Sequence, residues 1–126
     1  MFKRISGVVI VAMFVFHLFT TTCSIGNNIT PEKKNEDWIS LVHESYLYGM
    51  KGEYWKSIEL AQKALEINPR ASEAYRLIGN AYELLGDEME KSGDYEKAEE
   101  YHKKATEAWN KAKKINPKII IPFYHE

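Results

Sequence analysis

Two copies of one pattern occur along this chain, and this internal repeat restricts the fold more than any other feature. Residues 63–69 (KALEINP) match residues 111–117 (KAKKINP) at five of seven positions. Residues 52–57 and 93–98 share the order glycine, acid, tyrosine, any residue, lysine, small residue. A segment repeated at this spacing is typical of a supersecondary unit that buries its apolar face against its neighbour.

The distance between matching residues is not constant along the chain. It is 34 from Tyr48 to Tyr82 and from Gly52 to Gly86, 41 from Tyr54 to Tyr95, and 48 from Pro69 to Pro117. The distance therefore grows by seven residues twice. Because seven residues are close to two turns at 3.6 residues per turn, such an insertion keeps the buried stripe on the same face. We expect a second hairpin with about two extra turns in each helix and a tip that projects about 10 Å further.

The local signals after the first 26 residues are helical. Apolar residues recur at i, i+3 and i+4, strand-like alternation is missing, and Gly and Pro fall at regular breaks. Thr30-Pro31-Glu32 has the residue types of a helix start. Asn68-Pro69 and Asn116-Pro117 favour helix ends, because the residue before Pro disfavours the helical region. The expected helices span about 31 or 36 to 50, 54 to 67, 71 to 91 and 94 to 115.

Gly86 leaves two alternatives for the second hairpin. In a continuous helix it costs about 1 kcal/mol relative to Ala. A break at Gly86-Asp87 with a loop to Gly93 avoids that cost. We favour the continuous helix, because Glu88-Met89-Glu90-Lys91 are good helix formers. In the added tip, Met89, Tyr95, Ala98 and Tyr101 are the candidates for packing, and the remainder is expected to be solvated.

Residues 37 to 117 resemble the tetratricopeptide repeat family, whose unit is a 34-residue helix-turn-helix. The resemblance implies an all-α fold of two antiparallel helical hairpins. Leu41, Glu44, Ser45, Ser57 and Ala61 depart from the commonest residues of the family, and Glu44 is the weakest match. The matching residues are Tyr48, Gly52, Tyr54, Ala64 and Pro69 in the first copy, and Tyr75, Ile78, Gly79, Tyr82, Ala105, Trp109, Ala112 and Pro117 in the second.

The resemblance also implies a concave groove lined by the first helix of each repeat, which takes an extended peptide or a partner helix. Arg76 and Asn80 are similar to the basic and amide pair with which some members hold a terminal carboxylate, although the third repeat that completes such a clamp is not among these residues. The groove residues implied by the resemblance are Val42, Tyr46, Met50, Arg70, Arg76, Asn80, Glu83 and Leu84.

The first 26 residues have the layout of an export signal. Lys3 and Arg4 precede an apolar run over residues 7–19, and small and polar residues follow. A cleaved signal and a retained membrane anchor both remain open. Cys23 resembles the lipidated cysteine of bacterial lipoproteins, but Thr20 to Thr22 depart from that motif, and cleavage after Gly26 would remove Cys23. Either way we expect an exported or membrane-associated protein of the cell envelope, with residues 27–36 as a linker or helix start.

Composition and motifs exclude several classes of function. A formal charge of −1 is too low for nucleic-acid binding through counterion release. One Cys excludes an intramolecular disulfide and a multi-cysteine metal site. His43, His102 and His125 lie in separate elements without paired-ligand spacing, and a nucleophile motif or a phosphate-binding glycine loop is missing. The sequence therefore predicts no enzyme, no cofactor and no metal.

The C-terminal tail, residues 118–126, is apolar over Ile119 to Tyr124 without helical periodicity. It can fold back over the last hairpin as a cap, insert into a partner or a second copy of the chain, or fray. We favour the cap. The sequence as a whole predicts a non-enzymatic protein-protein interaction module that acts as an envelope adaptor or assembly factor. The alternative is a structural subunit that self-associates, as a homo-oligomer, through this tail.

Overall fold

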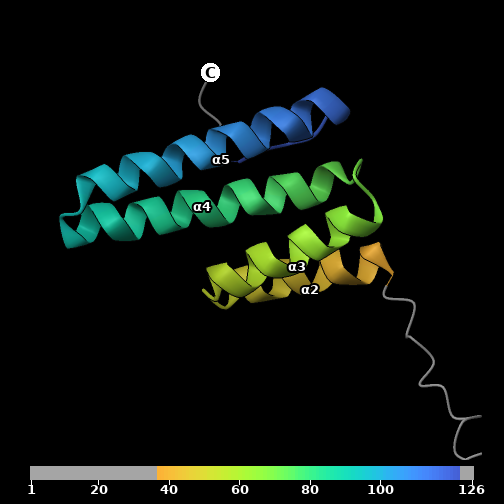
Figure 1. Ribbon diagram of the computed structural model, residues 1–126, viewed down its shortest axis with the longest axis horizontal. Helices are drawn as coiled ribbons and strands as arrows, with labels where there is room; N and C mark the ends of the chain where they lie inside the picture. Colours follow the sequence, from red (N-terminus) through yellow and green to blue (C-terminus); the bar gives the residue numbers. More distant parts are fainter. Residues whose placement is uncertain (1–36, 123–126) are drawn as a thin grey trace, which may run out of the picture. The chain divides into compact units, whose positions relative to one another are not determined.

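The computed structural model describes residues 37–122, which form two antiparallel helical hairpins (Figure 1). The first hairpin is α2 (Trp38–Met50) and α3 (Tyr54–Ile67), and the second is α4 (Ser72–Ser92) and α5 (Tyr95–Ile115). α3 packs on α4, and α2 contacts both α3 and α4. Within the described range every regular element is a helix. The predicted all-α class and the pair of hairpins are confirmed.

The helix ends lie where the turn residues place them. The Asp37 carboxylate accepts a hydrogen bond from the Ile39 backbone N–H and caps α2, so the described helix starts at Trp38, two residues after the later predicted start. The Thr30-Pro31-Glu32 signal lies outside the described residues. Gly52 and Gly93 end the first helix of each hairpin at φ +80° and +86°, a left-handed conformation that favours glycine. Asn68 and Asn116 end α3 and α5 in extended conformation before Pro.

Small side chains let the helices approach closely. Ala61, Ala64, Ala74, Ala105 and Ala112 are fully buried. Larger aliphatic side chains, such as Leu41, Leu60 and Ile78, fill the space between them. The resulting core is continuous from the first hairpin to α5, which is the arrangement that a stacked repeat requires.

Two departures from the family pattern compensate for each other in this core. Ser45 of α2 and Ser57 of α3 are both buried. The Ser45 hydroxyl donates to the Ser57 carbonyl oxygen at 2.8 Å, and the two hydroxyl oxygens lie 3.1 Å apart. A buried polar group is tolerated when it is hydrogen-bonded, so the pair is compatible with close packing of the first hairpin.

The second hairpin is longer than the first by the predicted amount. α4 and α5 have 21 residues each, against 14 in α3. α4 runs through Gly86 without a break, so the continuous-helix alternative is confirmed. At the tip Ala98 and Tyr101 are buried and Met89 is half-buried, as predicted. Tyr95 was expected to pack but is exposed, because it is the first residue of α5 and no other helix covers it.

The extra turns repeat a seven-residue packing unit in each helix of this hairpin. We name the base unit as residues 75–81 (YRLIGNA) with 105–111 (ATEAWNK), and the tip unit as residues 82–88 (YELLGDE) with 98–104 (AEEYHKK). In the base unit Gly79 faces the Trp109 ring, and in the tip unit Gly86 faces the His102 ring. Lys111 lies over Tyr75 and Lys104 over Tyr82 in the same way, at 5.8 and 5.6 Å from the ring centroids. The insertion therefore preserves register across the hairpin.

The described part of the C-terminal tail folds back on the second hairpin. Ile121 is buried against Ala105, Trp109 and Ala112, and Ile119 packs beside them. Ile120 points outward and is 84% exposed. Over residues 118–122 this arrangement is the cap that we favoured, and it leaves Ile119 and Ile121 in intramolecular contacts. The rest of the tail, residues 123–126, lies outside the described residues.

A search of residues 37–122 for a helix long and apolar enough to cross a membrane finds none. The leader, with Cys23, lies outside this range.

Candidate partner-binding groove

An open groove lies between α2 and α4, with its floor formed by the start of α3. Five of the residues predicted for a partner groove line it: Tyr46, Met50, Arg76, Asn80 and Leu84. Tyr46 and Met50 are 45% and 71% exposed, and both line this groove. Residues 76, 80 and 84 follow one another at i, i+4 along α4, so they share one face of that helix. The groove is an apolar, solvent-accessible surface.

The two polar groups at the groove are already engaged within the protein. The Arg76 guanidinium donates to the Glu73 carboxylate one turn earlier on α4. The Asn80 side-chain oxygen accepts a hydrogen bond of 3.1 Å from the Trp109 indole N–H. These bonds use the Asn80 oxygen and one Arg76 nitrogen, whereas a terminal carboxylate would accept from the Asn80 NH2 and from other guanidinium N–H groups. The carboxylate clamp therefore stays a prediction.

Three of the predicted groove residues lie elsewhere. Val42 is half-buried and packs against the core of the first hairpin. Arg70 is exposed in the loop between the hairpins, where its backbone N–H donates to the Asn68 side chain. Glu83 lies on the face of α4 that meets α5, because it is one residue, or about 100°, away from Leu84 around the helix. None of these three residues is part of the groove lining.

The sequence prediction also missed part of the groove. It took lining residues from the first helix of each repeat, but Tyr54 and Ser57 come from α3. Their signal is the sharp turn at Gly52, which brings the first turn of α3 back beside the end of α2. Leu77 and Ala81 of α4 were missed as well, and Gly49 of α2 completes the lining.

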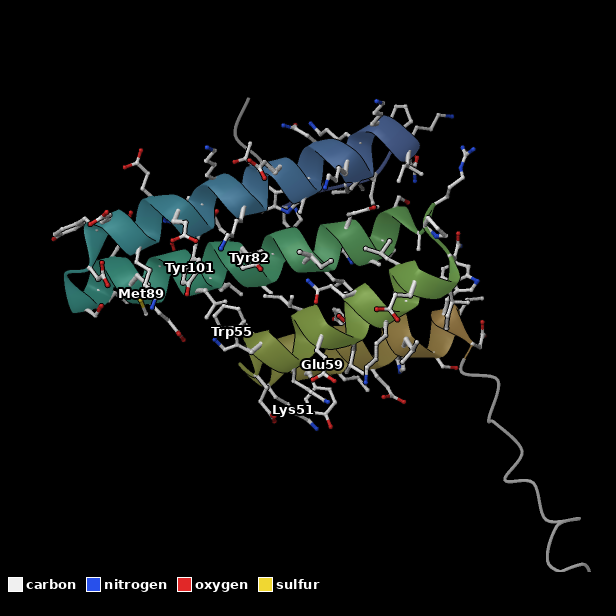
Figure 2. All side chains as sticks on the ribbon, viewed as in Figure 1. Lys51, Trp55, Glu59, Tyr82, Met89 and Tyr101 are labelled. Carbon is white, nitrogen blue, oxygen red and sulfur yellow. The ribbon has the colours of Figure 1, made fainter. Side chains whose placement is uncertain are left out.

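An aromatic cluster marks the step where the shorter first hairpin ends (Figure 2). Trp55, at the start of α3, packs edge-on against Tyr82 at 6.1 Å and Tyr101 at 5.8 Å between ring centroids. Aromatic pairs in such edge-to-face arrangements contribute about 0.5–1.5 kcal/mol beyond their burial. The cluster joins the first turn of α3 to the second hairpin and so positions Tyr54 and Ser57 in the groove.

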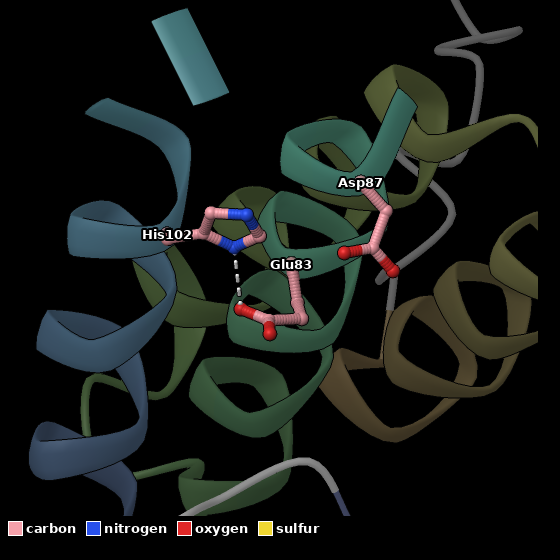
Figure 3. Close-up of side chains that lie close together, drawn as sticks. All are labelled: Glu83, Asp87 and His102. Atoms are coloured by element: carbon pink, nitrogen blue, oxygen red, sulfur yellow. Dashed lines mark hydrogen bonds and ion pairs between the residues drawn. The ribbon is translucent and has the colours of Figure 1, made fainter. Parts of the chain in front are cut away.

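A second group of polar side chains gathers beyond this step, between α4 and α5 (Figure 3). Glu83 and Asp87 lie one turn apart on α4, and His102 faces them from α5. The His102 Nδ1 lies 3.0 Å from a Glu83 oxygen, and its Nε2 lies 3.5 Å from a Glu90 oxygen. Burial of the ring lowers the pKa of His102, but the hydrogen bond to Glu83 and the charges of Glu83, Glu90 and Asp87 together raise that pKa above its ordinary value.

Sequence reasoning missed this group because it considered each histidine alone. Two spacings in the sequence carry the signal. Glu83 and Asp87 are four residues apart and so share one face of α4. Gly86 and His102 each lie seven residues from Gly79 and Trp109, and the two glycine–ring pairs are packed alike. The sequence alone does not give the register of α4 against α5, so it could not predict that His102 lies beside Glu83 and Asp87.

A sequence model of the tetratricopeptide repeat family matches residues 40–111, more than half of the chain. The chain belongs to the tetratricopeptide repeat family. Tetratricopeptide repeats typically serve as non-catalytic protein-protein interaction modules. A search of curated proteins found no significant match to this sequence.

Proposed function

We propose that this tetratricopeptide repeat protein is an adaptor or assembly factor that holds a protein partner in the groove between α2 and α4. The observation that carries the proposal is the exposure of Tyr46 and Met50 on a groove whose lining also includes the aliphatic side chains of Leu77, Ala81 and Leu84. Apolar side chains gathered along a groove are the kind of surface that a protein partner can cover. An extended peptide or an amphipathic helix with apolar anchors one turn apart fits this lining.

We further propose that the protein acts in the cell envelope, exported or tethered through its N-terminus. The support is the sequence of the leader: basic Lys3 and Arg4, the apolar run over residues 7–19, and the small residues around Cys23. Cell fractionation of the full-length chain tests this proposal. Recovery with the membrane or the exported fraction is expected, and recovery in the cytosol would contradict it.

A crosslinked pull-down with the full-length chain tests the groove. The test variant is Tyr46→Ala/Arg76→Glu, which removes an exposed aromatic anchor and reverses one charge at the groove. The matched control is Tyr95→Ala/Lys103→Glu, which likewise removes one tyrosine ring and reverses one positive charge, at exposed positions of the second hairpin. We expect the control to retain the partner and the test variant to lose it with helicity unchanged by circular dichroism. Equal capture by both variants would contradict the groove proposal.

A further inference from the structure

We propose that the tip of the second hairpin binds a divalent transition-metal cation of the zinc type through Glu83, Asp87 and His102. The three side chains come from two helices, and each offers a ligand atom within 4.8 Å of the other two. All three are half-buried, so a cation can reach them from solvent while the surrounding helices hold them in place.

The spacing of the donors suits such a cation. Zn²⁺ bonds to imidazole nitrogen and carboxylate oxygen at about 2.0–2.2 Å, so two ligands at a tetrahedral angle lie about 3.4 Å apart. The His102 Nδ1 and the Glu83 oxygen already lie 3.0 Å apart. The cation would replace the proton shared by these two atoms, and a small rotation of the Asp87 side chain would bring in the third ligand. Water can occupy the fourth position.

The local charge also favours a cation. Glu83, Asp87 and Glu90 surround one imidazole, so even a protonated His102 leaves a net negative charge. On α5, Lys103 next to His102 is exposed, and Lys104 is paired with Glu100 and lies over Tyr82. The mixture of one nitrogen and two oxygen donors favours zinc-type ions over Mg²⁺ or Ca²⁺, which prefer oxygen ligands alone.

The comparison of the two packing units of this hairpin is independent support. The tip unit keeps the tyrosine, the glycine, the buried alanine and the lysine of the base unit. Eight of the fourteen positions differ between the two units, and the three proposed ligands are among them. Arg76, Asn80 and Trp109 of the base unit correspond to Glu83, Asp87 and His102 of the tip unit, and these are the three proposed ligands.

Gly86 supports the placement of the imidazole. A Cβ at Gly86 would lie 2.5 Å from Cε1 and 2.7 Å from Nδ1 of His102, so the ring occupies the space that only glycine leaves. Glycine in a helix interior costs about 1 kcal/mol relative to alanine. The tip therefore retains a destabilising residue that lets the imidazole sit between Glu83 and Asp87.

Titration of the full-length chain with Zn²⁺ by calorimetry tests the proposal. We expect one zinc ion per chain and a higher thermal midpoint with zinc. His102→Gln, Glu83→Gln and Asp87→Asn should each weaken the binding about tenfold or more. His43→Gln and Glu88→Gln are the matched controls, since they change an exposed histidine of α2 and an exposed acid of α4. Both should bind zinc as the unchanged chain does.

Co²⁺ serves as a second probe, because its visible spectrum reports the ligands. A site of one imidazole and two carboxylates gives no thiolate-to-cobalt absorption, which separates it from binding at Cys23. Zinc affinity that is unchanged in His102→Gln would overturn the proposal, as would the absence of saturable binding. Circular dichroism of each variant ensures that lost binding does not reflect lost folding.

Discussion

The base unit and the tip unit of the second hairpin share one frame but differ in what holds them together. In the base unit the Trp109 ring is buried against Gly79, and its N–H bonds to Asn80. In the tip unit the His102 ring lies against Gly86, remains 29% exposed, and pairs with acids. The same register therefore supports an apolar contact near the groove and a polar cluster beyond it. A seven-residue insertion can add new chemistry without disturbing the groove.

The location of the groove follows from this difference. Arg76, Leu77, Asn80 and Ala81 of the base unit line it, whereas Leu84 is the one lining residue from the tip unit. The groove is thus built mainly on the part of α4 that is fixed by buried contacts with α5. A binding surface needs such support, because loosely held residues lose more conformational entropy when they bind.

The largest difference between the units is expected from removal of the rings. Trp109→Ala leaves a cavity in the core and should lower the free energy of unfolding by about 3–5 kcal/mol. His102→Ala removes a half-exposed ring and an ion pair and should cost no more than about 1 kcal/mol. Denaturant unfolding in the presence of a chelator measures both values. Equal losses would show that the two units are held in the same way.

The glycines should differ in the same direction. Gly79→Ala places a Cβ 2.3 Å from Cδ1 and Nε1 of the buried Trp109 ring and should cost about 1–3 kcal/mol, because the packed core leaves the ring little room to shift. Gly86→Ala meets the His102 ring, which can swing toward solvent, and gains about 1 kcal/mol of helix propensity. Its stability should stay within about 1 kcal/mol of the unchanged chain. A loss at Gly86 as large as that at Gly79, measured by chemical unfolding, would contradict this reasoning.

The smallest contrast concerns the residue after each glycine. Asn80→Ala removes the hydrogen bond to the Trp109 N–H and should cost about 0.5–1.5 kcal/mol. Asp87→Ala, at the equivalent position of the tip unit, should change stability by less than about 0.5 kcal/mol without metal. The thermal midpoints of the two variants in chelator provide the comparison. A larger loss of stability for Asp87→Ala than for Asn80→Ala would mean that Asp87 stabilises the fold even without a cation.

Much of the fold could be predicted because its signals are local. We used the turn glycines, the Asn-Pro helix ends and the 34-residue spacing to predict the helices. The predicted bounds of α3 equal the observed ones, and those of the other helices lie within one to two residues of the observed ends. The seven-residue growth of the spacing predicted the long hairpin, since periodicity alone decides which face is buried. The polar pairing of Ser45 with Ser57 could not be anticipated, because it depends on contact between two helices.

The site was only partly predictable for a related reason. Tyr46, Met50, Arg76, Asn80 and Leu84 were found through the family pattern, but Glu83 was assigned to the wrong face of α4 by a rotation of one residue. The cluster at the tip requires the register between α4 and α5, which no short motif encodes. Interhelical contacts, rather than helix positions, were the missing information.

Hydrogen exchange of the full-length chain tests most directly whether the two units share a frame but are held differently. In chelator we expect the α4 amides of the tip unit, residues 82–88, to exchange faster than those of the base unit, residues 75–81. The tip unit also has buried residues such as Leu85 and Tyr101, but its half-exposed His102 contacts should open locally more easily than the buried Trp109 contacts of the base unit. Zinc should slow exchange in the tip unit alone. Equal protection of both units in chelator, unchanged by zinc, would contradict the account.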